Sequence, residues 1–247
     1  MQEVLYERLT PSEFQSRLKK APIAYLPLGT LEWHGAHLPL GSDSLQSQTL
    51  FIKLAQLVGG IVLPPLFLGP DGAKEIDGHE YYGMDICGFS PRAPQQLKGS
   101  AYWIPSDLFL VLLEAVLKQL SRAGFKIVVA HGHGPSTQCV IDNSERLGKK
   151  FSLTIMTVWR NKDQRDPDME FQYDHAAMNE TSIMMALHPE LVHMENLSMD
   201  RRAKPLAIIG KDPRIHASTE HGERIIRLHL KRMEKILKDQ LLCLEKN

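Results

Sequence analysis

Short apolar runs alternate with longer segments of helical periodicity over most of the chain. The apolar runs that predict strands lie at 21–28, 61–63, 125–130 and 152–159. Apolar residues spaced three and four apart predict helices at 44–58, 107–122, 136–147, 180–187 and 220–242. Strands that alternate with helices form a mainly parallel sheet covered on both faces. The pattern therefore predicts an α/β fold, a three-layer sandwich that forms one domain over residues 1–247.

Two local features add detail to this pattern. The helix at 107–122 is expected to be capped by Ser106 or Asp107 and to stop at Gly124. The stretch 69–99 contains six glycines and three prolines and shows little periodicity, so we expect a long irregular loop there. Loops of this length are often functional.

Composition narrows the class of protein. The 247 residues carry 29 Lys plus Arg and 29 Asp plus Glu, so the chain lacks the basic excess typical of nucleic-acid binders. Its three cysteines are widely separated and form no CxxC pair, which argues against a disulfide framework or a thiolate zinc site. The N-terminus lacks the apolar core of a signal peptide, and no apolar run approaches the ~18 residues of a membrane span. We therefore expect a cytoplasmic protein without nucleic-acid or membrane partners.

Histidines and carboxylates gather in the loop after the first predicted strand. Glu32 and His34 are two residues apart, so they point the same way in an extended segment. Glycines at 35 and 41 allow the loop to fold back and bring Asp43 near them. Carboxylates with imidazoles are a ligand set for first-row divalent metals, and zinc, manganese and iron all suit it.

Two further segments carry similar groups. His131 and His133 directly follow a predicted buried strand, and His175 and Glu180 lead into a predicted helix. In sheets of this kind ligands bind beyond the carboxyl ends of the strands. A single histidine is more often a structural or surface residue, and that interpretation suits His188, His193, His216, His221 and His229. Phosphate-binding glycine loops and the GxSxG nucleophile motif are absent from the sequence.

The segment PLGTLEWHGAHLPLGSD at 27–43 strongly resembles the signature of the creatininase family of creatinine amidohydrolases. Later segments resemble further family motifs in the same order, at 124–134, 175–182, 186–189 and 210–213. The resemblance implies a single α/β domain, a site for two divalent metal ions, and a homo-oligomer, either a hexamer or a smaller cyclic assembly. It also implies hydrolysis of a non-peptide C–N bond in a small-molecule amide, cyclic amide or formamide.

Carried over position by position, the resemblance assigns a role to each matching residue. Glu32 would hold one metal, His34 the other, and Asp43 would bridge them, while His133 would complete the first metal site. His175 would transfer a proton near the substrate.

This chain departs from the family pattern at two places. His131 stands where the family usually has Asn, and Pro135 stands where creatininase itself has a metal-binding Glu. A proline side chain cannot ligate a metal, so Glu180 or a water would have to replace that ligand.

The ligands suggest a mechanism. A water activated between two metals would attack the amide carbonyl, His175 would protonate the leaving nitrogen, and Glu180 would take part in catalysis. Backbone N–H groups at 132–136 would stabilise the oxyanion. We expect the substrate to be bound by Trp159, Phe171, Tyr173 and Gly134, with 161–174 acting as a flap. The alternatives are a deformylase or peptide-trimming enzyme of cofactor biosynthesis, and a non-catalytic member that binds a metal or ligand.

Overall fold

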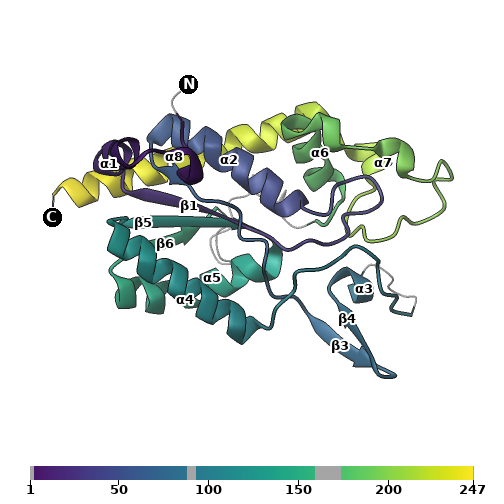
Figure 1. The fold of residues 1–247 in the computed structure, drawn as a ribbon. Coiled ribbons are helices and arrows are strands. Elements are labelled where there is room, and N and C mark those ends of the chain that lie inside the picture. Colours follow the sequence, from purple (N-terminus) through teal and green to yellow (C-terminus); the bar gives the residue numbers. More distant parts are fainter. Residues whose placement is uncertain (1–2, 88–92, 159–173, 247) are drawn as a thin grey trace.

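A parallel four-stranded sheet forms the centre of the computed structural model, which describes residues 3–87, 93–158 and 174–246 (Figure 1). The strand order is β2-β1-β5-β6. The strands are β2 (Ile61–Val62), β1 (Ile23–Leu28), β5 (Ile127–Gly132) and β6 (Thr154–Thr157). All neighbouring pairs in this sheet are parallel, as expected when helices connect successive strands.

Helices cover both faces of the sheet (Figure 1). One face packs against α2 (Ser42–Val58), α6 (Met178–Leu187) and α8 (Thr219–Glu245), and the other against α4 (Ser106–Ala123) and α5 (Gly134–Phe151). The shorter α-helices are α1 (Pro11–Lys20), α3 (Met84–Cys87) and α7 (Pro213–His216). Outside the central sheet lie the hairpin described below and the short 3₁₀ helices η1 (Tyr6–Arg8), η4 (Pro189–Leu191) and η5 (Met194–Asn196). The predicted α/β sandwich is confirmed.

The side chains of β1 show how the sheet divides the core. Ile23 and Tyr25 belong to the hydrophobic cluster that α2 and α8 complete, whereas Ala24 and Leu26 belong to the cluster that α4 and α5 complete. Successive strand residues point to opposite faces, and both faces of this sheet are covered. Every residue of β1 is therefore buried, which explains its unbroken apolar sequence.

The start of α4 and the presence of α1 differ from the expectation. The N-cap of α4 is Pro105, with no side-chain hydrogen bond, so neither Ser106 nor Asp107 caps it. Its C-cap is Gly124 in the left-handed conformation, as predicted. The spacing of apolar residues did not predict α1, although Thr10 and Glu13 form a capping box at its start.

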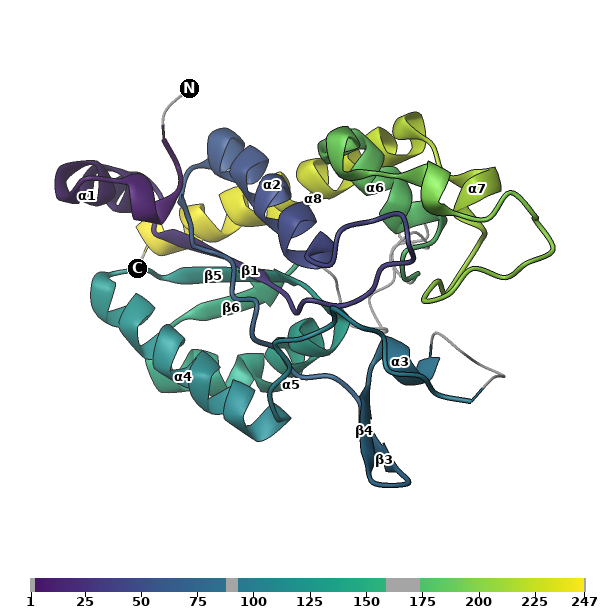
Figure 2. The ribbon, with the colours of Figure 1, turned by 45° about the vertical axis from the view of Figure 1, so that its right-hand side comes forward.

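Part of the 69–99 stretch is regular, so the prediction of an irregular loop was wrong there. Strands β3 (Ala73–Ile76) and β4 (His79–Tyr82) pair as an antiparallel hairpin that projects from the body of the molecule (Figure 2). Asp77 and Gly78 connect them, both with positive φ, as an Asp-Gly hairpin turn requires. The strand side chains are largely exposed, so they lack the apolar alternation that identifies a half-buried strand.

Within the described residues, no helix is long and apolar enough to cross a membrane.

Candidate metal centre

The carboxyl ends of β1 and β5 lie side by side, because Leu28 pairs with Gly132. The chain leaves β1 in a loop that turns back on itself, where the Glu32 N–H donates to the Leu40 carbonyl at 3.0 Å. The loop leads into α2, which carries Asp43 in its first turn. This folding places Asp43 beside the loop residues, as the glycine spacing predicted.

Glu32, Asp43 and His133 form one group of possible metal ligands. His133 Nδ1 lies 2.9 Å from Glu32 Oε1 and 3.3 Å from Asp43 Oδ2. Glu32 and His133 are 2% and 4% exposed, so this group faces the interior rather than bulk water. Two carboxylates and an imidazole are a common set of donors for a divalent cation.

His34, Asp43 and Glu180 form a second group. His34 Nε2 lies 3.5 Å from Asp43 Oδ2 and 3.5 Å from Glu180 Oε1. The other ring nitrogen, Nδ1, lies 3.1 Å from the Glu32 carbonyl oxygen. A carbonyl accepts a hydrogen bond, so Nδ1 carries a proton and Nε2 is the nitrogen that faces the carboxylates. Asp43 is common to both groups.

The charges of these residues are strongly coupled. Burial by itself would lower the pKa of His34, but the Glu180 and Asp43 carboxylates raise it well above the ordinary value. The pKa of His133 is raised in the same way, against burial, by Glu32, Asp43 and Asp71. Burial would raise the pKa of Asp43, yet His34 and His133 hold it well below its usual range. The carboxylates thus create a site that favours positive charge, whether it comes from protons or from metal ions.

Several buried polar atoms of the site have no hydrogen-bond partner among the described residues, namely Glu32 Oε2, His34 Nε2, Asp43 Oδ2 and His133 Nε2. Leaving such atoms unsatisfied is costly in a protein interior. Their types are those that ligate divalent metals. The residues present therefore fit a metal centre.

His175 lies at the edge of both groups. Its Nε2 is 2.7 Å from the Trp33 carbonyl oxygen, so Nε2 carries a proton and donates it to that hydrogen bond. Its Nδ1 lies 4.0 Å from Glu32 Oε1, and its ring stacks on His34 with centroids 4.4 Å apart. The accepting nitrogen of His175 therefore points into the site.

The start of α6 holds Glu180 in position. The Asp174 carboxylate accepts hydrogen bonds from the backbone N–H groups of Asn179 and Glu180, at 2.7 and 3.1 Å. Glu180 Oε2 accepts one from the Ala176 N–H at 2.5 Å, and Gln46 donates to Oε1 at 3.3 Å. Burial raises the pKa of Asp174 to about 7. These contacts aim Glu180 Oε1 at His34.

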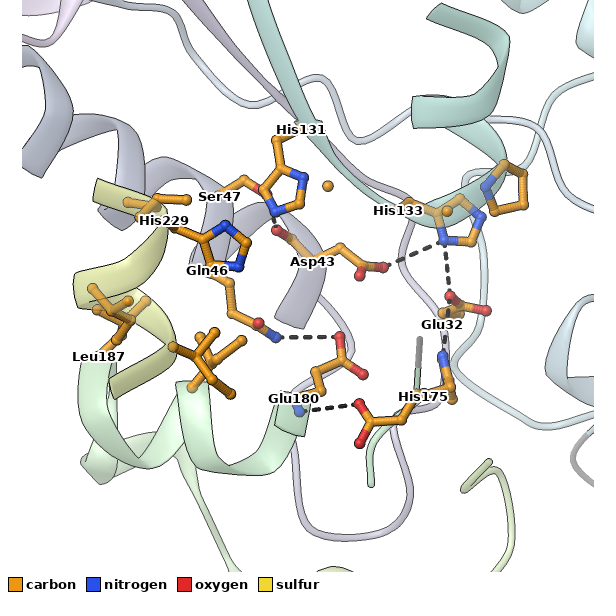
Figure 3. A pocket seen from close by; sticks show the side chains of 18 of the residues that line it. Glu32, Asp43, Gln46, Ser47, His131, His133, His175, Glu180, Leu187 and His229 are labelled. Atoms are coloured by element: carbon orange, nitrogen blue, oxygen red, sulfur yellow. Dashed lines mark hydrogen bonds and ion pairs between the residues drawn. The ribbon is translucent and has the colours of Figure 1, made fainter. Parts of the chain in front are cut away.

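A cavity of about 340 Å³ opens beside these residues (Figure 3). Its charged end is lined by Glu32, Asp43, Asp71, His133, Asp174, His175 and Glu180. Ser47, His131, Leu187 and His229 lie at the opposite end (Figure 3). The cavity is also lined by Ile225 and by Leu50, Ile183 and Ile226, which pack in the same hydrophobic cluster as Leu187. Figure 3 shows His131 and His229 near one another, on the far side of the cavity from His133 and His175.

The structure brings together six of the predicted site residues, Glu32, His34, Asp43, His133, His175 and Glu180. Gly134 also lines the cavity. The three aromatic residues expected to bind the substrate, Trp159, Phe171 and Tyr173, lie outside the described residues. His131 lines the cavity but belongs to neither group of possible ligands that contains Asp43.

Sequence reasoning missed several residues of this site, among them Asp174, which holds Glu180 in position. Asp71 has Oδ2 3.5 Å from His133 Nε2, and it lies in the 69–99 stretch, well after the second predicted strand, where no spacing marked it. Gln46 lies one helical turn after Asp43, on the same face of α2. His229 was interpreted as a structural or surface residue, but it lines the cavity at 6% exposure.

Comparison with known proteins identifies the family. The family model for creatininase, described as creatinine amidohydrolase, matches residues 7–237. The chain belongs to the creatininase family. It is a hydrolase of that family, and the resemblance carried by residues 27–43 is confirmed.

Two curated relatives of this creatininase-family chain have different substrates in their names. Creatinine amidohydrolase from Pseudomonas putida is 23% identical over 212 residues, which are 78% of this chain and 75% of that protein. The 3-dehydro-scyllo-inosose hydrolase from Thermotoga maritima is 24% identical over 203 residues, 78% of this chain and 58% of that protein.

Solved creatininase structures share the fold. One described as "Creatininase Mn" has a TM-score of 0.71 at 19% identity, covering 97% of this chain and 99% of that one. A creatininase mutant described as "Zn-Zn type" has a TM-score of 0.72 at 18% identity, with the same coverage of both chains. At such low identity these likenesses establish the creatininase fold of this chain and not its substrate.

Proposed function

We propose that the chain is a metal-dependent hydrolase that cleaves a non-peptide C–N bond in a small amide, cyclic amide or formamide. The observation that carries this proposal is the position of Asp43, whose carboxylate is shared by two groups of largely buried possible ligands. A carboxylate that belongs to both groups could help to hold two adjacent divalent ions. The zinc and manganese named for creatininase structures favour these two ions here, and the donor set also suits iron.

The ligand sets follow from the distances. Glu32, Asp43 and His133 would hold one ion, and His34, Asp43 and Glu180 would hold the other. Glu180 thereby takes the place of the ligand that Pro135 cannot supply. Bound divalent ions would contribute Lewis acidity and a water activated near neutral pH.

His175 is suited to proton transfer. Its Nε2–H is held by the Trp33 carbonyl at 2.7 Å, which fixes the tautomer and leaves Nδ1 free of its own proton. Nδ1 faces the carboxylate cluster and can accept a proton from the attacking water. The same nitrogen can then deliver that proton to the leaving nitrogen of the amide.

The start of α5 supplies groups for the oxyanion. The first backbone N–H groups of a helix lack intrahelical partners, and the helix dipole favours negative charge there. Gly134 begins α5 and lines the cavity, whereas Pro135 has no N–H to give. The N–H groups of Gly134 and Ser136 would therefore stabilise the oxygen of the carbonyl under attack.

Two classes of substrate are candidates for this chain. A creatinine-like or formamide substrate follows from the proposed C–N chemistry. The Thermotoga maritima relative favours a second candidate, 3-dehydro-scyllo-inosose, because its identity to this chain is as high.

The test uses one purified sample for two measurements. Elemental analysis should find two divalent ions per chain, and activity should appear on creatinine or on an N-formyl amine. Short peptides and the inosose complete the panel, and activity on one of these alone would favour the corresponding alternative over the proposed C–N hydrolase. Zinc and manganese are each added in turn. A chain that binds metal but turns over nothing in the panel would support the non-catalytic alternative, and a chain without metal would refute the metal centre.

Assembly and location stay predictions. We expect a homo-oligomer, a hexamer or a smaller cyclic form, in the cytoplasm. Light scattering coupled to size-exclusion chromatography measures the first, and fractionation of the source cells measures the second.

A further inference from the structure

The cavity is larger than the metal centre needs. About 340 Å³ lies at the lower end of the range for small-molecule sites, yet the possible ligands occupy only one end. The other end is lined by Ser47, Leu50, His131, Ile183, Leu187, Ile225, Ile226 and His229, and the Ser47 hydroxyl already donates to the Asp43 carbonyl oxygen at 2.6 Å. We call this end the distal compartment.

Three helices and one strand contribute to the distal compartment. Leu50 comes from α2, Ile183 from α6 and Ile225 from α8, while His131 comes from β5. Leu50 and Ile226 are buried and belong to the main hydrophobic cluster on this face of the sheet. The compartment is therefore a recess in the hydrophobic core and not part of the solvent-exposed surface.

The charge of the cavity changes from one end to the other. Five carboxylates stand at the metal end, and the distal compartment presents aliphatic side chains and two imidazoles. Burial lowers the pKa of His229 to about 3, so this ring is neutral at physiological pH. Gln46, with an uncharged amide, stands between the two ends and donates to Glu180 (Figure 3). An ionised group in the distal compartment would lose its hydration among aliphatic side chains and the uncharged His229 ring, with no opposite charge among the described residues that line this end.

We propose that the distal compartment binds an uncharged, apolar substituent of the substrate, on the part remote from the bond that is cleaved. This inference rests on the proposed function, which places the scissile amide at the metal end. The favoured substrates are neutral amides that carry an aryl or branched alkyl group. Amides whose far end carries a carboxylate are disfavoured, and each methylene added to a neutral substituent improves binding by about fourfold until the compartment is filled.

Binding of two matched amides tests this directly and needs no turnover. Para-methylbenzamide and para-carboxybenzamide share the amide and the ring and differ in the charge at the remote end. By isothermal titration calorimetry, the methyl compound should bind at least about tenfold more tightly. Equal affinities, or tighter binding of the carboxylate, would overturn the proposal.

Two variants of the distal compartment and one surface control show where the amides bind. Ile225→Trp should fill the compartment and weaken para-methylbenzamide by about tenfold or more, whereas Val111→Trp, on the exposed surface of α4, should not change it. Leu187→Arg places a cation at the partly buried rim and should improve the affinity for para-carboxybenzamide. Unfolding curves check that each variant is folded. An affinity for para-methylbenzamide within twofold of wild type in a folded Ile225→Trp protein contradicts the inference.

The measurements distinguish a failure of the proposed C–N hydrolase from a failure of the proposed distal compartment. If no amide is hydrolysed but para-methylbenzamide binds and Ile225→Trp removes that binding, the distal compartment stands and the C–N hydrolase does not. If amides are hydrolysed at rates that do not depend on the remote substituent, the hydrolase stands and the distal compartment is refuted.

Discussion

The Nε2 atom of His34 lies 3.5 Å from the Oδ2 atom of Asp43, and neither atom has a hydrogen-bond partner among the described residues. His34 is fully buried. A buried imidazole nitrogen and a buried carboxylate oxygen that face each other without a hydrogen bond leave room for a third, positively charged group between them. The first predictions follow from that arrangement.

Asp43 is predicted to be the residue on which both metal sites depend. Asp43→Ala should lower the metal content below one ion per chain and reduce hydrolysis by at least about 100-fold. Loss of a group that only hydrogen-bonds to a metal ligand typically costs about 10–100-fold in activity, and loss of the ligand itself should cost more. Elemental analysis and kcat measure the two effects. Asp107→Ala is the matched control, an exposed Asp in the first turn of α4. Full metal content in Asp43→Ala would refute the bridging role.

Glu180 is predicted to ligate only one of the two ions. It contacts His34 and not His133, so Glu180→Gln should reduce the metal content from two ions per chain to one. The exposed Glu190→Gln should keep both ions. Retention of two tightly bound ions in Glu180→Gln would show that the second site is built differently.

Asp71 is predicted to position His133. Its Oδ2 lies 3.5 Å from the Nε2 atom of His133, on the side of the ring away from Glu32. A carboxylate behind a histidine ligand orients the ring and raises its basicity, so Asp71→Asn should weaken metal binding by about 10–100-fold. Titration of the metal-free protein with zinc measures this. Asp77→Asn, at the hairpin turn, is the control, and equal zinc affinities in the two variants would contradict the prediction.

Acid should destabilise the metal-free protein partly through His37. Burial lowers the pKa of His37 to about 4 from an ordinary value near 6.5, and its Nε2 lies 2.8 Å from Thr181 Oγ1. Between these two pKa values the unfolded chain binds a proton that the folded chain does not. The stability from neutral His37 is therefore complete above pH 6.5 and is lost as the pH falls toward 4.

Urea unfolding at several pH values checks this effect with His37→Gln, which keeps a donor for Thr181. Over the same pH window the slope of the unfolding free energy should be smaller in His37→Gln by about 1.4 kcal/mol per pH unit. A chelator removes metal from both samples. Parallel pH profiles for the two proteins would mean that His37 is protonated alike in the folded and unfolded states.

Gly132 and Gly134 flank His133 and are predicted to respond differently to alanine. A Cβ at Gly132 would lie 1.9 Å from the Leu28 carbonyl oxygen, and its φ of 146° is rare for other residues. A Cβ at Gly134 would meet nothing within 4 Å. Gly132→Ala should therefore cost about 1–3 kcal/mol or more in unfolding free energy, and Gly134→Ala should change it by less than about 1 kcal/mol. Similar thermal unfolding of the two variants would contradict this view.

Much of the fold could be predicted from the sequence because local periodicity reports burial. The unbroken apolar run ending at Leu28 and the apolar stripe near the C-terminus correspond to β1 and α8. The spacing of Glu32 and His34, with the glycines that follow, placed both residues in one turning loop. The hairpin at Asp77 and Gly78 was missed because its strands lie in solvent and leave no apolar pattern.

The sequence by itself determined the alternation of strands and helices, the family, and which histidines and carboxylates stand near strand ends. Only the tertiary structure decided that Glu180 faces His34, that Asp71 lies behind His133, and that His229 lines the cavity. The physical reason is that local sequence sets the conformation of each segment and the face it buries. Which side chains then meet across segments depends on how α2, α6 and α8 pack against the sheet, and no short stretch of sequence encodes that arrangement.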